Sequence, residues 1–224
     1  MRYDPERHHR RSIRLRGYDY RAVGAYFITI VVQDRACLFG EVVEGAMRLN
    51  DAGRMVERWW LELNCRFPHV LTDAYVVMPN HFHGIVVIHS PPPDTTAPPD
   101  VGADLRVCPD SMGAHGVGAD LRVRPNTRVC PDSGGAHTGA PLPTIVQWFK
   151  TMTTNEYIRM VKHAGWTPFQ GRLWQRNYYE HIIRNERALE RIRDYILTNP
   201  LYWHLDRENT HAIGINSLEE EWFG

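Results

Sequence analysis

Short runs of apolar residues along the chain predict β-strands. Residues 26–32 (YFITIVV) are β-branched or aromatic throughout and indicate a buried strand. Residues 69–78 and 81–88 have a similar character and are interrupted only by Pro79-Asn80, so we expect them to pair as a hairpin. Residues 172–183 indicate a further extended segment.

Three other segments carry apolar residues at helical spacing. The first covers residues 55–63 and follows Asn50 and Asp51, either of which can cap the start of a helix. The second begins after residue 142 and continues toward His163. The third spans residues 186–198 and is the last regular element that the pattern predicts.

The order of these elements indicates the fold class. Residues 38–49 predict one more short hairpin, with Glu44-Gly45 near its turn, which gives the order strand, hairpin, helix, hairpin, helix, strand, helix. Strands grouped in hairpins with interspersed helices predict an α+β fold, an antiparallel sheet with helices packed mainly on one face. A chain of 224 residues is long enough for one such domain, spanning residues 1–224.

Residues 89–143 do not fit this pattern. They hold ten of the 15 prolines and seven of the 17 glycines, and the sequence of residues 101–115 returns in expanded form at 117–137. Two Pro/Gly-rich copies are too few for a solenoid. We therefore expect a disordered loop inserted into the domain and expanded by duplication. Lengthening a loop from ~6 to ~50 residues adds only about 2 kcal/mol of closure entropy, so the fold can tolerate it.

Charge is balanced overall but unevenly distributed. The net charge is zero, yet 24 of the 26 basic residues are arginine, the side chain whose planar fork fits phosphate. Residues 1–21 hold seven arginines against three acids, and residues 172–193 hold six against three. These segments indicate a local phosphate-binding face. The alternative is a GC-rich genome, which favours arginine codons whatever the function.

Hydropathy argues against a membrane-spanning protein and against a secreted one. No apolar run approaches the ~20 residues that a membrane-spanning helix requires. The first 20 residues have no apolar core of a secretory signal. We therefore expect a cytoplasmic protein with no membrane partner.

His81 and His83 are the first candidates for chemistry. Side chains alternate across a strand, so both imidazoles share one face while Phe82 points into the core. That geometry suits two ligands of one metal ion. Paired histidines on a strand are also often surface or hydrogen-bonded residues, so the spacing alone leaves both interpretations open.

The last predicted helix carries the second candidate pair. Ala188, Ile192, Tyr195 and Asn199 follow at i, i+4, i+7 and i+11 and share one stripe. A tyrosine with a carboxamide one turn later can place a nucleophilic oxygen beside a metal that the amide helps to hold. The alternative is an ordinary amphipathic helix, with Tyr195 in the core and Asn199 as its C-cap.

Together these motifs resemble the REP-associated tyrosine transposases, a branch of the HUH endonuclease superfamily related to single-strand insertion-sequence transposases. The matching stretches appear in the family's order and cover nearly the whole chain outside the insert: 12–20, 24–40, 77–87, 145–158, 173–186 and 191–203. The resemblance implies a ferredoxin-like, HUH-type fold. It also implies a metal-dependent single-strand DNA endonuclease and strand transferase that acts beside hairpins of palindromic repeats.

The resemblance also implies roles for particular residues. Tyr195 matches the catalytic tyrosine, which forms a 5′-phosphotyrosine, and His81 and His83 match the two histidines of the superfamily. Asn199 matches the third metal ligand, where related insertion-sequence enzymes usually have glutamine. Mixed nitrogen and oxygen ligands suit Mg²⁺ or Mn²⁺. Candidates to contact DNA are Arg14, Arg16, Arg176, Arg184, Arg191, Arg193 and Trp203.

Other interpretations stay open at this stage. Tyr178 and Tyr179 are rival nucleophiles, although neither has a polar partner at helical spacing. The protein could be a domesticated binder that grips DNA hairpins without cutting them, or a zinc hydrolase, although the sequence offers no further ligand cluster of the kind that zinc sites require. For the transposase-like reading we expect single-stranded DNA with a hairpin as partner, association with the nucleoid, and a monomer or homodimer.

Overall fold

The computed structural model describes residues 18–89 and 140–213. Arg14, Arg16 and residues 90–139 of the expected insert lie outside the described residues. Within the described part, no helix is both long and apolar enough to cross a membrane.

Four strands form one antiparallel sheet in the order β4-β5-β1-β6. Their bounds are β1 Gly24–Val31, β4 Val70–Val77, β5 His81–Ile88 and β6 Tyr179–Ile183. Counting only these four, the sheet runs fourth, first, third, second from the β6 edge, which is the order of a ferredoxin-like split βαβ fold. A separate hairpin is formed by β2 (Gly40–Val43) and β3 (Ala46–Leu49).

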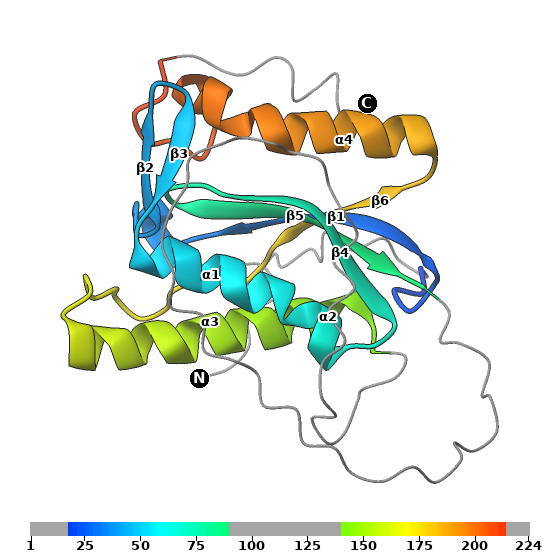
Figure 1. Cartoon of the computed structure of the whole chain (residues 1–224), viewed down its shortest axis with the longest axis horizontal. Coiled ribbons are helices and arrows are strands. Elements are labelled where there is room, and N and C mark those ends of the chain that lie inside the picture. The colour runs from blue at the N-terminus through cyan, green and yellow to red at the C-terminus, as the bar shows by residue number, and fades with distance from the viewer. Residues whose placement is uncertain (1–17, 90–139, 214–224) are drawn as a thin grey trace, which may run out of the picture.

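The helices lie on both faces of the sheet (Figure 1). On one face lie α1 (Asp51–Leu61), α2 (Leu63–Arg66) and α3 (Leu142–Ala164), and on the other lies α4 (Glu186–Thr198). The predicted α+β fold with helices mainly on one face is confirmed. Two 3-10 helices complete the described part, η1 (Gln33–Arg35) after β1 and η2 (Asn199–Leu205) directly after α4.

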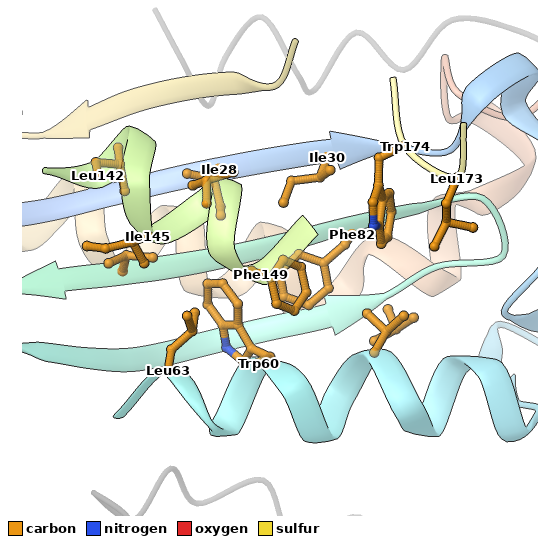
Figure 2. Close-up of a cluster of buried hydrophobic side chains, with 14 of the residues drawn as sticks. Ile28, Ile30, Trp60, Leu63, Phe82, Leu142, Ile145, Phe149, Leu173 and Trp174 are labelled. Atoms are coloured by element: carbon orange, nitrogen blue, oxygen red, sulfur yellow. The ribbon is translucent and has the colours of Figure 1, made fainter. Parts of the chain in front are cut away.

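The larger hydrophobic core lies between the sheet and helices α1 and α3. Alternate residues of the central strands, such as Ile28 and Phe82, meet Trp60 of α1 and Phe149 of α3 there (Figure 2). The ring of Phe82 lies 4.7 Å from that of Trp60 and 5.3 Å from that of Phe149, measured between centroids. Aromatic side chains bury large apolar areas, so this cluster fixes which face of β5 turns inward.

A second, smaller core lies on the opposite face, beneath α4. It joins Phe27 of β1 and Ile85 of β5 to Ile192 and Ile196 of α4. Since Phe82 faces the larger core, strand alternation turns His81 and His83 toward α4.

Capping and turn residues begin the predicted elements where the sequence indicated. The side chain of Asn50 accepts a hydrogen bond from the Gly53 amide, and that of Asn185 accepts one from the Ala188 amide. Glu44 and Gly45 both have positive φ, 53° and 75°, and form the turn of the β2–β3 hairpin.

The structure differs from the prediction in two places. The expected extended segment 172–183 forms a strand only in β6, while Trp174 makes a single isolated bridge to Val32. Leu173 and Trp174 pack into the larger core beside α3, which turns this part away from continuous pairing. Residues 186–198 are the last regular element that the sequence predicts, but the chain continues after α4 as the 3-10 helix η2.

Gly84 offers a test of the larger core. A Cβ on Gly84 would lie 2.6 Å from Cζ2 of Trp60 and 2.8 Å from Cε1 of Phe82. We expect Gly84→Ala to lower the free energy of unfolding, measured by urea titration, by about 1–3 kcal/mol, because a packed core tolerates no added methyl group. Gly24→Ala is the matched control, since its Cβ would meet Tyr26 only at 3.9 Å. A Gly84→Ala protein as stable as the Gly24→Ala protein would contradict this packing.

Candidate functional site

The two histidines of β5 lie buried on the face that α4 covers. His81 is 0% and His83 is 4% exposed, and their ring centroids are 4.5 Å apart. His83 stands opposite Thr29 of β1 in the sheet register, and its Nδ1 lies 2.8 Å from Oγ1 of Thr29. With Nδ1 engaged in this hydrogen bond, Nε2 of His83 is the nitrogen left for other partners.

Tyr195 of α4 and Asn199, the C-cap of that helix, approach these histidines from the other side. The two residues are one helical turn apart and are 5% and 3% exposed. Oη of Tyr195 lies 3.4 Å from Nε2 of His83. The helical stripe and the alternating strand therefore bring together the four residues that the sequence singled out: His81, His83, Tyr195 and Asn199.

Asp206, which follows η2, is a member of the site that sequence reasoning missed. Its Oδ2 lies 3.7 Å from Nε2 of His81, and it offers a ligand atom within 4.8 Å of those of His81 and His83. Its Oδ1 accepts a hydrogen bond of 2.7 Å from the Glu208 amide, which fixes the carboxylate. No spacing rule connects Asp206 to the β5 histidines, so only the path of η2 reveals the contact.

Asn80 determines which nitrogen of His81 carries the proton. Nδ2 of Asn80 donates to two backbone carbonyls, of Arg35 at 3.1 Å and of Glu208 at 2.7 Å. A carbonyl can only accept, so the orientation of this carboxamide is settled and its Oδ1 faces Nδ1 of His81 at 2.9 Å. Nδ1 of His81 must therefore be the donor. Its Nε2 keeps a lone pair directed at Asp206.

Burial controls the protonation of the site. It lowers the pKa of His81 to about 4, and it holds the pKa of His83 well below its usual range, with the neighbouring His81 adding to the effect. Burial also raises the pKa of Asp206 to about 6. At neutral pH both imidazoles are thus neutral while most Asp206 is ionised. The lone pair on Nε2 of neutral His81 then faces a carboxylate oxygen of Asp206, and neither atom can donate a hydrogen bond to the other.

These atoms fit a divalent cation. Nε2 of His81 and Oδ1 of Asn199 are buried and have no hydrogen-bond partner. An unpaired buried acceptor costs roughly 1–3 kcal/mol, which coordination of a cation offsets. Two imidazole nitrogens with carboxylate and carboxamide oxygens form the kind of mixed ligand set that Mn²⁺ accepts. His81, His83 and Asp206 could therefore hold a metal, with Asn199 beside them.

Trp203 and Arg193, both expected to contact DNA, have different surroundings. The ring of Trp203 lies 5.9 Å from that of His81, so this side chain is next to the site. Arg193 donates from two nitrogens to the carboxylate of Asp73 on β4, at 3.0 Å and 2.5 Å. That bidentate pair ties α4 to the sheet.

The other candidates are spread more widely. Arg184 and Arg191 are exposed, and Arg176 lines a pocket beside α3. Of the rival tyrosines, Tyr178 packs against the larger core on the far face of the sheet. Tyr179 lies on the α4 face, where its ring meets Phe27 at 6.5 Å between centroids.

Metal binding can be tested without any assay of activity. A ligand that binds only the folded protein adds about 2.7 kcal/mol of stability at 100 times its Kd, so Mn²⁺ is expected to raise the unfolding temperature. Asp206→Ala removes one oxygen donor and is expected to reduce that increase. Asp194→Ala, which removes an exposed carboxylate from α4, should keep it. Equal Mn²⁺-induced shifts in the Asp206→Ala and wild-type proteins would exclude Asp206 as a ligand.

Comparisons with known proteins place this geometry in context. No family model matches the chain. Among solved structures, the chain is similar to a REP-associated tyrosine transposase bound to a REP hairpin, with 17% identity, a TM-score of 0.44, and coverage of 85% of this chain and 73% of that one. It is also similar to a putative transposase from Deinococcus radiodurans, with 14% identity, a TM-score of 0.37, and coverage of 83% and 96%.

One curated relative is much closer in sequence. An uncharacterized protein of Haemophilus influenzae is 34% identical over 209 residues, which are 92% of this chain and 96% of that protein. Similarity at this level over nearly the full length of both proteins reflects common descent. The chain belongs to the same protein family as this Haemophilus influenzae protein.

Proposed function

We propose that this protein is a metal-dependent single-strand DNA endonuclease and strand transferase with Tyr195 as its nucleophile. The observation that carries the proposal is the convergence of Tyr195 on the buried cluster of His81, His83, Asn199 and Asp206, with Oη of Tyr195 3.4 Å from Nε2 of His83. The sequence motifs that resemble the REP-associated tyrosine transposases support the same chemistry.

Tyr195 would form the covalent bond to DNA. A phenol of ordinary pKa ~10 requires about 4 kcal/mol to deprotonate at pH 7, so the nucleophile needs assistance. A divalent cation at this site would supply positive charge to the scissile phosphate and to the attacking oxygen. Oη of Tyr195 then attacks phosphorus, the bond from phosphorus to the 3′ oxygen breaks, and that oxygen leaves as a free 3′-OH after taking up a proton.

The product retains the energy of the broken bond. Tyr195 now carries a 5′-phosphate in an ester linkage, so a second 3′-OH can attack the same phosphorus and release the tyrosine without ATP. Strand cleavage and strand joining are therefore one reaction run in two directions. The rigid placement of Tyr195 on α4, held to the sheet through Arg193 and Asp73, keeps the phenol in position for both steps.

The surface beside the site favours unpaired DNA. Leu201 and Tyr202 of η2 are 56% and 37% exposed, and the ring of the next residue, Trp203, lies 5.9 Å from that of His81. Aromatic side chains stack on bases of single strands, whose π-faces are accessible only when the duplex is open. We infer that the strand to be cut is unpaired where it crosses η2, as it is in the flank of a hairpin.

Replacing the nucleophile is the most direct test. Tyr195→Phe is expected to abolish both cleavage and the covalent protein–DNA adduct on a labelled hairpin with single-stranded flanks, read on a denaturing gel. Binding of the same DNA should persist, because the ring stays in place and only the hydroxyl is lost. Tyr179→Phe, which alters the other tyrosine on this face, should keep the adduct. An adduct that survives Tyr195→Phe but not Tyr179→Phe would show that Tyr179, and not Tyr195, is the nucleophile. A wild-type protein that binds the DNA without cutting it would favour the domesticated binder.

Asn199 can be tested by titration of the metal. If its Oδ1 contacts the cation, Asn199→Ala should raise the Mn²⁺ concentration at half-maximal cleavage roughly tenfold or more, with little change in DNA binding. Asn199→Gln keeps a carboxamide oxygen and should retain part of the activity. If Asn199 serves only as the C-cap of α4, its loss would lower stability by about 1 kcal/mol and leave the metal midpoint unchanged.

A further inference from the structure

A pocket of about 330 Å³ lies beside α3, away from the cluster of histidines. One wall comes from α3, through residues such as Gln147, Lys150 and Thr154, and the other from the segment Gly171–Arg176. Its volume falls at the small end of the range found for sites that bind organic ligands.

The charge of this pocket is all of one sign. Lys150, Arg172 and Arg176 line it, and none of its lining residues is acidic. Among the described residues neither arginine makes an ion pair, and both are exposed. The lining also contributes the carboxamides of Gln147 and Asn155 and the hydroxyl of Thr151, beside the apolar Leu173 and Trp174. Such a lining suits a group that carries negative charge and several hydrogen-bond acceptors.

Lys150 is a buried residue of the pocket lining. This lysine is only 9% exposed, and its Nζ donates to the backbone carbonyls of Gln175 at 2.6 Å and of Arg176 at 3.1 Å. Burial and the nearby Arg172 lower the pKa of Lys150 to about 8. The two carbonyls accept two of the three N–H donors of Lys150. An anion in the pocket would relieve the repulsion between the positive charges of Lys150 and Arg172.

The pocket is connected to the proposed active site through the sheet. The Gln175 amide donates to the carbonyl of Val31, and Val31 stands opposite His81 in the register of β1 and β5. Only β1 lies between Gln175 and His81, so their backbones are two strand spacings apart, roughly 10 Å at ~4.8 Å per spacing. The pocket and the histidines lie on opposite faces of the sheet, so one strand of DNA that contacts both must pass around the edge of the sheet.

We propose that this pocket binds a backbone phosphate and its nucleotide in the single-stranded DNA, at a position removed from the scissile phosphate. The proposal rests on the proposed function for the identity of the ligand, but not for the pocket itself. Arg172 and Arg176 hold the phosphate, and the carboxamides of Gln147 and Asn155 meet the edge of the base. The pocket thereby sets which phosphate along the strand reaches Tyr195.

The test measures how salt affects binding of a fluorescently labelled single-stranded oligonucleotide to the full chain, with metal removed by a chelator so that no cleavage occurs. Each phosphate contact to a single strand contributes about 0.7 to the slope of log K against log salt concentration. We expect Arg172→Ala and Arg176→Ala each to reduce the slope by about 0.7 and the double variant by about 1.4. The variant Arg172→Lys with Arg176→Lys should keep most of the slope but bind more weakly, because lysine lacks the planar fork.

Arg159→Ala is the matched control. Arg159 is an exposed arginine of α3, the helix that forms one wall of the pocket, but it pairs with Glu156 and does not line the pocket. A wild-type slope in the double alanine variant, or an equal loss in Arg159→Ala, would overturn the proposal. The result for the pocket can be distinguished from the result of the Tyr195→Phe test of the nucleophile. If the double alanine variant has a reduced slope but the wild-type protein forms no Tyr195 adduct, the pocket is supported and the proposed chemistry is rejected. If the wild-type protein forms the adduct but the slope of the double variant is unchanged, the chemistry is supported and the pocket is rejected.

Discussion

The buried carboxamide of Asn80 is the interaction on which the site depends. It joins three segments that are distant in the sequence: the turn at Arg35 after β1, the histidine strand β5, and the loop at Glu208 beyond η2. The Arg35 side chain reinforces this junction through an ion pair of 2.8 Å with Glu208. Because one amide group both positions the loop that carries Asp206 and sets the tautomer of His81, ligand placement and ligand chemistry cannot vary independently.

The two faces of the sheet have different tasks. The face toward α1 and α3 is filled with large aromatic side chains and supplies most of the apolar burial, as Figure 2 shows around Trp60 and Phe82. The face toward α4 has a smaller core and, at one end, buried polar groups that burial alone would disfavour. Strand alternation lets β5 serve both, with Phe82 anchoring the strand from one side while His81 and His83 face the other. The packing of the first face holds the polar groups of the second in place.

Periodicity accounts for the parts of the fold and site that could be predicted. Alternation in β5 and the 3.6-residue repeat of α4 placed His81, His83, Tyr195 and Asn199 on the correct faces, since each rule acts within one element. The roles of Asp206 and Asn80 in the site could not be predicted, because their contacts depend on how η2 and the β4–β5 turn pack against other elements. Arg193 shows that periodicity also cannot predict the partner of a charged side chain. Its spacing on α4 does not distinguish an arginine that faces DNA from one that pairs with Asp73, a partner on a strand far away in sequence.

The unsatisfied atoms of the site carry a cost that the rest of the fold must offset. Nε2 of His81 and Oδ1 of Asn199 are two buried acceptors without donors, at roughly 1–3 kcal/mol each, while a native domain is stable by only about 5–15 kcal/mol. Replacing such groups with apolar side chains would be stabilising if they served only the fold. Their orientation is nevertheless enforced, through Asn80 for one and the end of α4 for the other. Unsatisfied groups that the surrounding structure holds in place are characteristic of binding sites, and a cation is a partner that could satisfy such acceptors.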